Sequence, residues 1–131
     1  MSLHATGTFE IDTWEATPYD ERDGTTLTRT HFTKTFHGEI EGTSTAELLM
    51  ASAPEGSAAY VGFERITCRI HDREGSFILH HNATQSHGAQ SATWSVMPNS
   101  GTGDLRDLRG EGQITIDADG KHTFTLDYDF D

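Results

Sequence analysis

The feature that most constrains this chain is a succession of short alternating runs separated by turn residues. Thr, Val, Ile, Phe and Tyr cluster in runs of about ten residues, bounded by Gly, Asp, Asn and Pro. Helical periodicity is almost absent. The pattern predicts eight strands, near residues 4–14, 27–38, 41–52, 58–71, 75–84, 89–97, 111–117 and 121–130. Eight evenly spaced strands are typical of an up-and-down barrel or a sandwich.

The run at 121–130 shows the clearest alternation and predicts one face of the core. Its apolar face consists of Phe124, Leu126, Tyr128 and Phe130. Hairpin turns are expected where an acidic residue precedes a glycine, because glycine adopts positive φ without strain: Glu41-Gly42, Glu74-Gly75 and Asp119-Gly120. The charged segment 19–24 is expected to be a mobile loop at one mouth of a barrel.

Composition limits the classes of partner. The 131 residues are expected to form a single domain over 1–131, and the formal net charge of −12 disfavours nucleic acids and anionic membranes. Cys68 is the only cysteine, so no intramolecular disulfide can form and a reducing compartment is expected. The N-terminus lacks a signal peptide, and no stretch is long and apolar enough to span a membrane. We therefore expect a cytoplasmic protein that binds neither nucleic acid nor membrane.

The glycine-rich connection Ser100–Gly112 is the most specific stretch of the chain. It occurs together with five further motifs: His4–Glu10, Val61–Arg65, Gly75–His81, Thr93–Pro98 and Leu126–Phe130. On these residues the chain resembles the bacterial domain-of-unknown-function 3224 family, which is similar in fold to the allene oxide cyclase and dirigent barrels. The resemblance covers His4 to Asp131.

The resemblance implies an all-β, eight-stranded antiparallel β-barrel that is usually oligomeric and has no assigned activity. The cyclases of similar fold rearrange a fatty-acid epoxide inside the barrel with little covalent chemistry by the protein. No residue here matches their catalytic set, so none is carried over, and fold alone does not fix function. Leu105 and Leu108 are expected to plug one end of the barrel.

Glu64 and His81 form the main candidate site. Alternation places Glu64 on the core face of 58–71 and His81 on the core face of 75–84. With a turn centred on Arg73-Glu74 the two would be diagonal neighbours across adjacent strands, whereas a shift of one residue would separate them onto opposite faces. A buried Glu beside a His can act as an acid/base unit. A structural hydrogen-bonded pair that fixes strand register is the alternative.

Further candidates line the predicted interior. Tyr128 is assigned a catalytic role, since its hydroxyl can orient a substrate carbonyl, although such a tyrosine is also an ordinary core residue. Tyr60, Phe77 and Trp94 are expected to line a ligand pocket. Glu47 is a further ligand-binding candidate, but leucines lie on both faces of its strand, so alternation does not decide where it points. Lys34 lies between Phe32 and Phe36 and is either an interior cation or, as the safer expectation, a side chain that reaches a barrel end.

The pattern predicts no metal site and no cofactor. His80 and His81 point to opposite faces of a strand, and neither H-x-H nor HExxH spacing occurs. Gly101-Thr102-Gly103 is followed by Asp104 and lacks the lysine of a phosphate-binding loop.

The leading hypothesis is a barrel that binds a small organic molecule, as an isomerase or cyclase in which Glu64 and His81 transfer a proton. Two alternatives stay open: a non-catalytic interaction barrel with a filled interior, and promiscuous abstraction of a carbon-bound proton by a desolvated Glu. Val61 and Phe63 lie on the face opposite Glu64 and indicate an outer apolar surface. Self-association, most simply as a dimer, would cover it.

Overall fold

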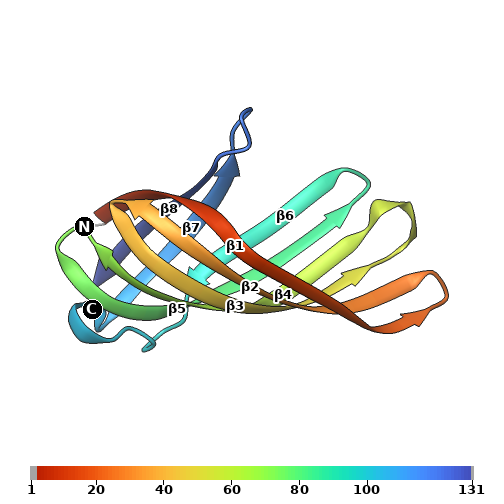
Figure 1. Ribbon diagram of the computed structural model, residues 1–131, viewed down its shortest axis with the longest axis horizontal. Coiled ribbons are helices and arrows are strands. Elements are labelled where there is room, and N and C mark those ends of the chain that lie inside the picture. The colour runs from red at the N-terminus through yellow and green to blue at the C-terminus, as the bar shows by residue number, and fades with distance from the viewer. Residues whose placement is uncertain (1–2, 131) are drawn as a thin grey trace.

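The computed structural model describes residues 3–130 and consists almost entirely of antiparallel strands (Figure 1). The elements are β1 (Leu3–Arg22), β2 (Thr25–Gly38), β3 (Ile40–Ser52), a short 3₁₀ turn η1 (Pro54–Gly56), β4 (Ala58–Ile70), β5 (Arg73–Ser86), β6 (Ala89–Val96), a second 3₁₀ turn η2 (Gly103–Leu105), β7 (Leu108–Ile116) and β8 (His122–Phe130). Each strand pairs with the next, and β8 pairs with β1. The barrel closes, which confirms the predicted fold. The described residues include no helix long and apolar enough to cross a membrane.

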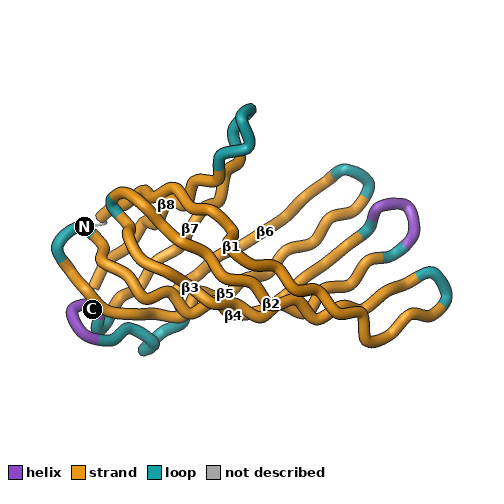
Figure 2. Tube along the Cα trace, in the orientation of Figure 1, coloured by secondary structure: helices purple, strands orange, loops and turns teal. Residues whose placement is uncertain are grey.

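The two ends of the barrel differ. The closed end, as we call it, carries the turns after β2 and β4, the β6–β7 connection, the start of β1 and the end of β8. We call the opposite end the open end. At the open end the β1–β2, β3–β4, β5–β6 and β7–β8 hairpins extend apart from one another (Figures 1 and 2). Strands β6 and β7 share only two residue pairs, Trp94 with Gly112 and Ser95 with Glu111. The barrel wall is therefore continuous only toward the closed end.

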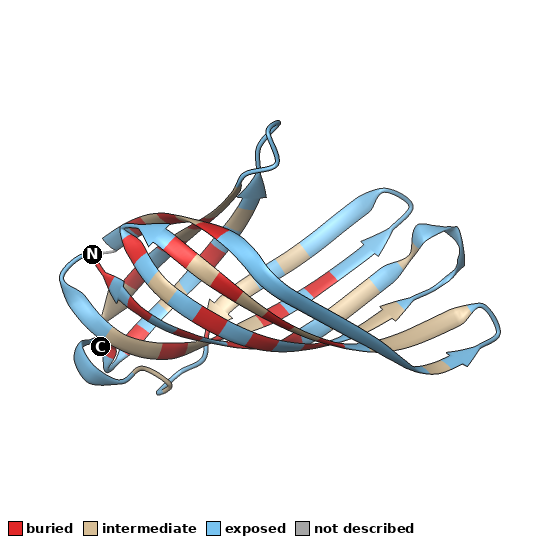
Figure 3. Ribbon diagram, in the orientation of Figure 1, coloured by how far each residue is buried: buried red, intermediate tan, exposed pale blue. Residues whose placement is uncertain are grey.

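The hydrophobic core fills the closed half, where buried residues alternate with exposed ones along each strand (Figure 3). Phe124, Leu126 and Tyr128 are all buried there, which confirms the inward face predicted for the last strand. Leu105 and Leu108 are completely buried in the same cluster, as expected of an end plug. The β6–β7 connection is fixed over β5 by the backbone hydrogen bond that Thr102 N–H donates to the Ser76 carbonyl.

Two of the three predicted hairpin turns are wrong. The β2–β3 turn lies at Gly38 and Glu39, and the β4–β5 turn lies between Ile70 and Arg73. A Cβ on Gly42 would overlap the backbone of Thr67, and a Cβ on Gly75 would overlap Thr102. These glycines allow a close approach between backbones rather than a turn, and local sequence does not separate the two uses. The turn predicted at Asp119-Gly120 is confirmed, with Gly120 at φ 82°.

Residues 19–24 do not form a loop as expected. Strand β1 continues to Arg22, and Asp23 and Gly24, at φ 53° and 82°, form a two-residue hairpin turn. The charged side chains are tolerated in a strand because the hairpin extends past the barrel body, where its side chains are mostly exposed. Register shifts between Ile11 and Thr13 and between Pro18 and Asp20 interrupt the pairing of β1 with β2.

Candidate functional site

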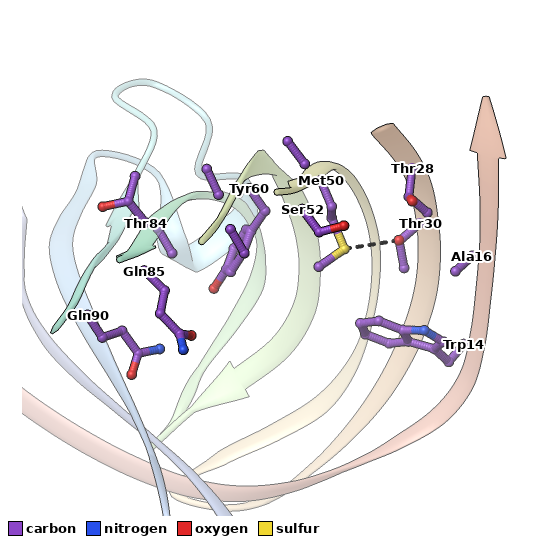
Figure 4. Close-up of a pocket in the computed structure, with 14 residues that line it drawn as sticks. Trp14, Ala16, Thr28, Thr30, Met50, Ser52, Tyr60, Thr84, Gln85 and Gln90 are labelled. Carbon is purple, nitrogen blue, oxygen red and sulfur yellow. Dashed lines mark hydrogen bonds between the residues drawn. The ribbon is translucent and has the colours of Figure 1, made fainter. Parts of the chain in front are cut away.

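A cavity opens between the hairpins at the open end. This outer cavity has a volume of about 230 Å³ and is lined by side chains from β1 to β6, including Trp14, Thr30, Met50, Tyr60, Ala83 and Gln90 (Figure 4). The Thr30 hydroxyl donates a hydrogen bond to Met50 Sδ at 3.1 Å. Apart from Tyr60, none of its lining residues is ionisable. The outer cavity is therefore suited to an apolar molecule and offers hydroxyl and amide groups at its rim.

A second, deeper cavity shares Trp14, Met50 and Tyr60 with the outer one. This inner cavity has a volume of about 160 Å³, and its remaining lining residues are mostly aromatic or aliphatic, with a few ionisable ones: Phe9, Ile11, Phe32, Lys34, Leu48, His81, Trp94, Ile114 and His122. The shared side chains make the two cavities neighbours along the barrel axis. The ionisable groups thus line a cavity that adjoins an apolar one.

One irregularity in β1 brings Trp14 to both cavities. Phe9 pairs with Phe36 and Ile11 pairs with Lys34, but beyond the shift at Asp12 it is Trp14 that pairs with Phe32. The extra residue of a bulge reverses which side chains point inward. The Trp14 ring stacks on Phe32 with centroids 5.4 Å apart, although about half of its surface is exposed (51%). Sequence reasoning missed Trp14 because simple alternation carries no sign of a bulge.

A polar belt crosses four consecutive strands at the floor of the inner cavity. It is formed by Lys34 on β2, Ser44 on β3, Glu64 on β4 and His81 on β5, and all four residues are buried. His81 Nε2 donates to Glu64 Oε1 at 2.7 Å, and Lys34 Nζ approaches the same oxygen at 3.4 Å. The Ser44 hydroxyl donates to Glu64 Oε2 at 2.5 Å. Both carboxylate oxygens are therefore partnered inside the protein.

The predicted pairing of Glu64 with His81 is confirmed, although through a different turn. Glu64 lies opposite Leu79, and His81 lies opposite Gly62, so the two are diagonal neighbours. A turn centred on Arg73-Glu74 would set Ile66 opposite His81, whereas Ile66 pairs with Phe77. The shift is an even number of residues, so each side chain stays on its predicted face.

The belt holds Glu64 in its charged form. Burial raises the pKa of Glu64, but the hydrogen bond from His81, the charge of Lys34 and the hydrogen bond from Ser44 together outweigh it and lower that pKa. For Lys34, burial lowers the pKa, and the attraction of Glu64 offsets this only in part. Desolvation therefore does not make Glu64 a weak acid, because three donors surround its carboxylate.

His81, rather than Glu64, presents a free atom to the cavity. A charged carboxylate only accepts hydrogen bonds, so His81 must donate from Nε2, and in the neutral ring this leaves Nδ1 as an acceptor. Nδ1 has no hydrogen-bond partner among residues 3–130, and His81 lines the inner cavity. Glu64 lines neither cavity. In this arrangement the carboxylate orients the imidazole, and the imidazole can exchange a proton with a bound molecule.

Tyr60 and Trp94, both predicted to line a ligand pocket, line the inner cavity together. The Tyr60 ring lies 6.3 Å from the His81 ring. Burial raises the pKa of Tyr60, and the nearby Trp94 indole N–H works against this effect. That indole N–H is buried and does not reach hydrogen-bond geometry with any described residue. Because this nitrogen has no exposed surface, the ring of Trp94, rather than its N–H group, forms part of the wall of the inner cavity.

Three predicted site residues lie elsewhere. Glu47 points outward, where Arg29 Nε donates to it at 2.8 Å and His31 Nδ1 at 3.2 Å, so it is not a carboxylate of the cavity. Phe77 is completely buried in the closed-half core and lines neither cavity, because its side chain fills the interior below them.

Tyr128 lies at the closed end and cannot orient a ligand in the cavities. Tyr128 pairs with Leu3 and Gly110. Burial raises the pKa of Tyr128, and the charged groups that add smaller effects are Arg73, Glu39 and Asp72.

The expectation for Lys34 is also corrected. Its side chain stays inside the barrel rather than reaching an end, because Glu64 and several phenylalanine rings receive its ammonium group. Among the described residues, no group of three or more His, Cys, Asp or Glu side chains is arranged to hold a metal ion.

Fold and site together define a closed antiparallel β-barrel whose interior is filled at one end and hollow at the other, with a buried polar belt between the two halves. The chain belongs to the family described as "Protein of unknown function (DUF3224)", which matches residues 5–128. A solved structure from Shewanella oneidensis MR-1, described as a protein with unknown function from the DUF3224 family, is similar to it at 32% identity and a TM-score of 0.87. The match covers 100% of this chain and 99% of that one. The comparison with curated proteins finds no match.

Proposed function

We propose that the barrel binds a small organic molecule in its open half, with the apolar part in the outer cavity and one polar group against His81 and Lys34. The observation that carries this proposal is the position of the polar belt at the floor of an apolar, open cavity. A filled interaction barrel would need no such space, whereas in the open half a small second cluster, Phe32, Ala46 and Leu48, leaves two cavities. The Lys34 amine lines the inner cavity and makes only one long contact with Glu64, so its remaining N–H donors favour an oxygen acceptor, such as a carbonyl, on the ligand.

The reaction best matched to this geometry is proton transfer of the isomerase or cyclase type. His81 Nδ1 would take a proton from a carbon next to the ligand carbonyl and return it at another atom, while the Glu64 carboxylate stabilises the imidazolium formed in between. Glu64 acts here as a positioning residue, because it touches His81 rather than the cavity. Its lowered pKa also makes it a weak base, so abstraction of a carbon-bound proton by Glu64 itself is not part of the proposal.

Binding can be tested through the two tryptophans of the chain, Trp14 and Trp94, which both line the inner cavity. In a ¹H–¹⁵N spectrum their indole N–H groups give two signals that report on the site. Acetophenone and ethylbenzene are probes of nearly equal size that differ in a carbonyl group. We expect acetophenone to shift both indole signals at lower concentration than ethylbenzene, because only its oxygen can accept a hydrogen bond from Lys34.

A matched pair of variants locates the binding. Ala83 is buried on β5 and lines the outer cavity, whereas Ala89 is exposed at the tip of the same hairpin and lines neither cavity. Ala83→Leu is expected to abolish the acetophenone shifts, and Ala89→Leu to leave them unchanged. Equal shifts in both variants, or none in the wild type at millimolar probe, would overturn the proposal.

The same proposal includes self-association through the outer face of β3 and β4. Leu49 and Val61 are cross-strand partners, and Phe63 follows Val61 on the same face; all three side chains are exposed. Light scattering after size exclusion is expected to give a dimer for the wild type and a smaller species for Phe63→Glu, because a charge on this face would be desolvated on association. A wild-type monomer at all concentrations would contradict this part.

A further inference from the structure

Lys34 is unusual in this chain because lysine is so scarce. The sequence contains only two lysines, Lys34 and Lys121, against 21 acidic residues. Lys121 is exposed in the β7–β8 hairpin, while Lys34 is 4% exposed on the inner face of β2. The Lys34 ammonium lies 4.2 Å from the centroid of the Phe9 ring and 5.1 Å from that of Phe32. An amine is thus held in an aromatic pocket that lines the inner cavity.

Glu64 does not need Lys34 to satisfy its carboxylate. His81 and Ser44 donate to its two oxygens at 2.7 and 2.5 Å, whereas the Lys34 contact, at 3.4 Å, is long for a charge-assisted hydrogen bond. The ammonium group has three N–H donors, and this long contact uses only one. Lys34 is therefore poorly explained as a structural ion-pair partner alone.

Burial makes the neutral, nucleophilic form of Lys34 easier to reach than that of an exposed lysine. Burial lowers the pKa of Lys34 in spite of the Glu64 carboxylate, and lysines desolvated in this way are the ones that attack carbonyl carbons. The titratable groups that share its surroundings are Glu64 on β4, His81 on β5, Tyr60 on β4 and His122 on β8. Of these, His81 donates to the same Glu64 oxygen that Lys34 approaches.

We propose that Lys34 forms an imine with small carbonyl compounds that enter the cavity. The proposal rests on the proposed function and narrows its ligand class to aldehydes and ketones with a compact apolar body. The inner cavity, at about 160 Å³, is close to the size of an engineered cavity of roughly 150 Å³ that holds benzene. A single aromatic ring with one carbonyl group therefore matches the available space.

The step balances without an oxidant, a reductant or a cofactor. The neutral Nζ of Lys34 attacks the carbonyl carbon, and the carbon–oxygen double bond becomes a single bond. One Nζ proton passes to the former carbonyl oxygen through His81 Nδ1, which gives a carbinolamine. The second Nζ proton follows the same route as the carbon–oxygen bond breaks, so the oxygen leaves as water and a carbon–nitrogen double bond remains. His81 ends in its starting form, still donating from Nε2 to Glu64.

Benzaldehyde with sodium cyanoborohydride tests this proposal, because the reductant converts an imine into a stable benzylamine. The full chain is treated at pH 7, and the adduct is located by peptide mapping. We expect one benzyl group on Lys34, with Lys121 largely unmodified. The adduct should be lost in Lys34→Arg, which keeps the positive charge, and should persist in Lys121→Arg, the matched control.

A pH series separates a buried, tuned amine from incidental labelling. Glu64→Gln removes the carboxylate charge that favours the ammonium form, so half-maximal labelling of Lys34 should move to lower pH than in the wild type. Labelling of Lys121 should not respond to this variant. An unchanged midpoint for Lys34 would overturn the role assigned to its surroundings.

The remaining outcomes are distinct. Adducts confined to Lys121 or the N-terminal amine, with acetophenone still shifting the indole signals, would overturn imine formation and leave ligand binding intact. Failure of both experiments would overturn the proposed function as well.

Discussion

Replacing Glu64 by leucine is expected to be among the most destabilising single changes in this barrel. The substitution keeps a side chain of similar size but removes the acceptor for three buried donors, on Lys34, Ser44 and His81. Water does not reach the carboxylate, because Glu64 is completely buried. Each of these donors is then left without an acceptor inside the protein, whereas water would hydrate it in the unfolded chain.

The expected loss is about 3–5 kcal/mol, the usual cost of removing one partner from a buried charged network. Glu47 provides a matched control on the neighbouring strand, since its carboxylate also holds one histidine and one basic side chain, His31 and Arg29, but on the exposed outer face. Solvent screens the charges of that cluster, so the free energy of unfolding of Glu47→Leu should be close to that of the wild type.

The double variant Glu64→Leu/Lys34→Met tests whether the loss comes from the unpaired amine. Removing both partners should recover part of the stability, with a coupling of about 0.5–3 kcal/mol relative to the sum of the single variants. Urea unfolding followed by circular dichroism measures all four proteins, and an unchanged m-value shows that the folded and unfolded states are comparable. If Glu64→Leu were no less stable than Glu47→Leu, or if the double variant were strictly additive, the reasoning from the buried belt would be refuted.

Three further results are expected. Glu64 has a lowered pKa in the folded state, so its contribution to stability is present above its unfolded pKa of about 4.3 and is lost as pH falls through the folded value. In Glu64→Gln the free energy of unfolding should therefore fall less steeply as the pH is lowered. Burial raises the pKa of Cys68 to about 12, so the native protein should not react with iodoacetamide at pH 8 while the urea-unfolded protein does, and rapid native labelling would contradict its buried position. A Cβ on Gly62 would overlap the Glu47 carbonyl and the Leu48 side chain, so Gly62→Ala should shift the melting temperature down sharply, and a wild-type value would show that β3 and β4 can separate at no cost.

The sequence by itself determined the strands and most of their faces. Alternation has a period of two that follows from the pleated backbone, so the inward positions of Glu64, His81 and Tyr128 could be predicted without knowing any partner strand. The pairing of Glu64 with His81 survived an incorrect turn, because the register shifted by an even number of residues. The family resemblance likewise predicted an eight-stranded barrel, which the structure confirms, and the family itself is confirmed by the match over residues 5–128.

Only the tertiary structure decided which inward residues meet a cavity and which are packed. Phe77 and Tyr128 face inward as predicted but lie in the filled half, whereas Trp14 reaches the cavities through a bulge that simple alternation does not reveal. The directions in which Glu47 and Lys34 point were decided only by the charged groups that neighbouring strands bring to them. The physical reason is that a side chain's face is set locally by the backbone, while filling, hollowness and charge pairing depend on how all eight strands close around one another.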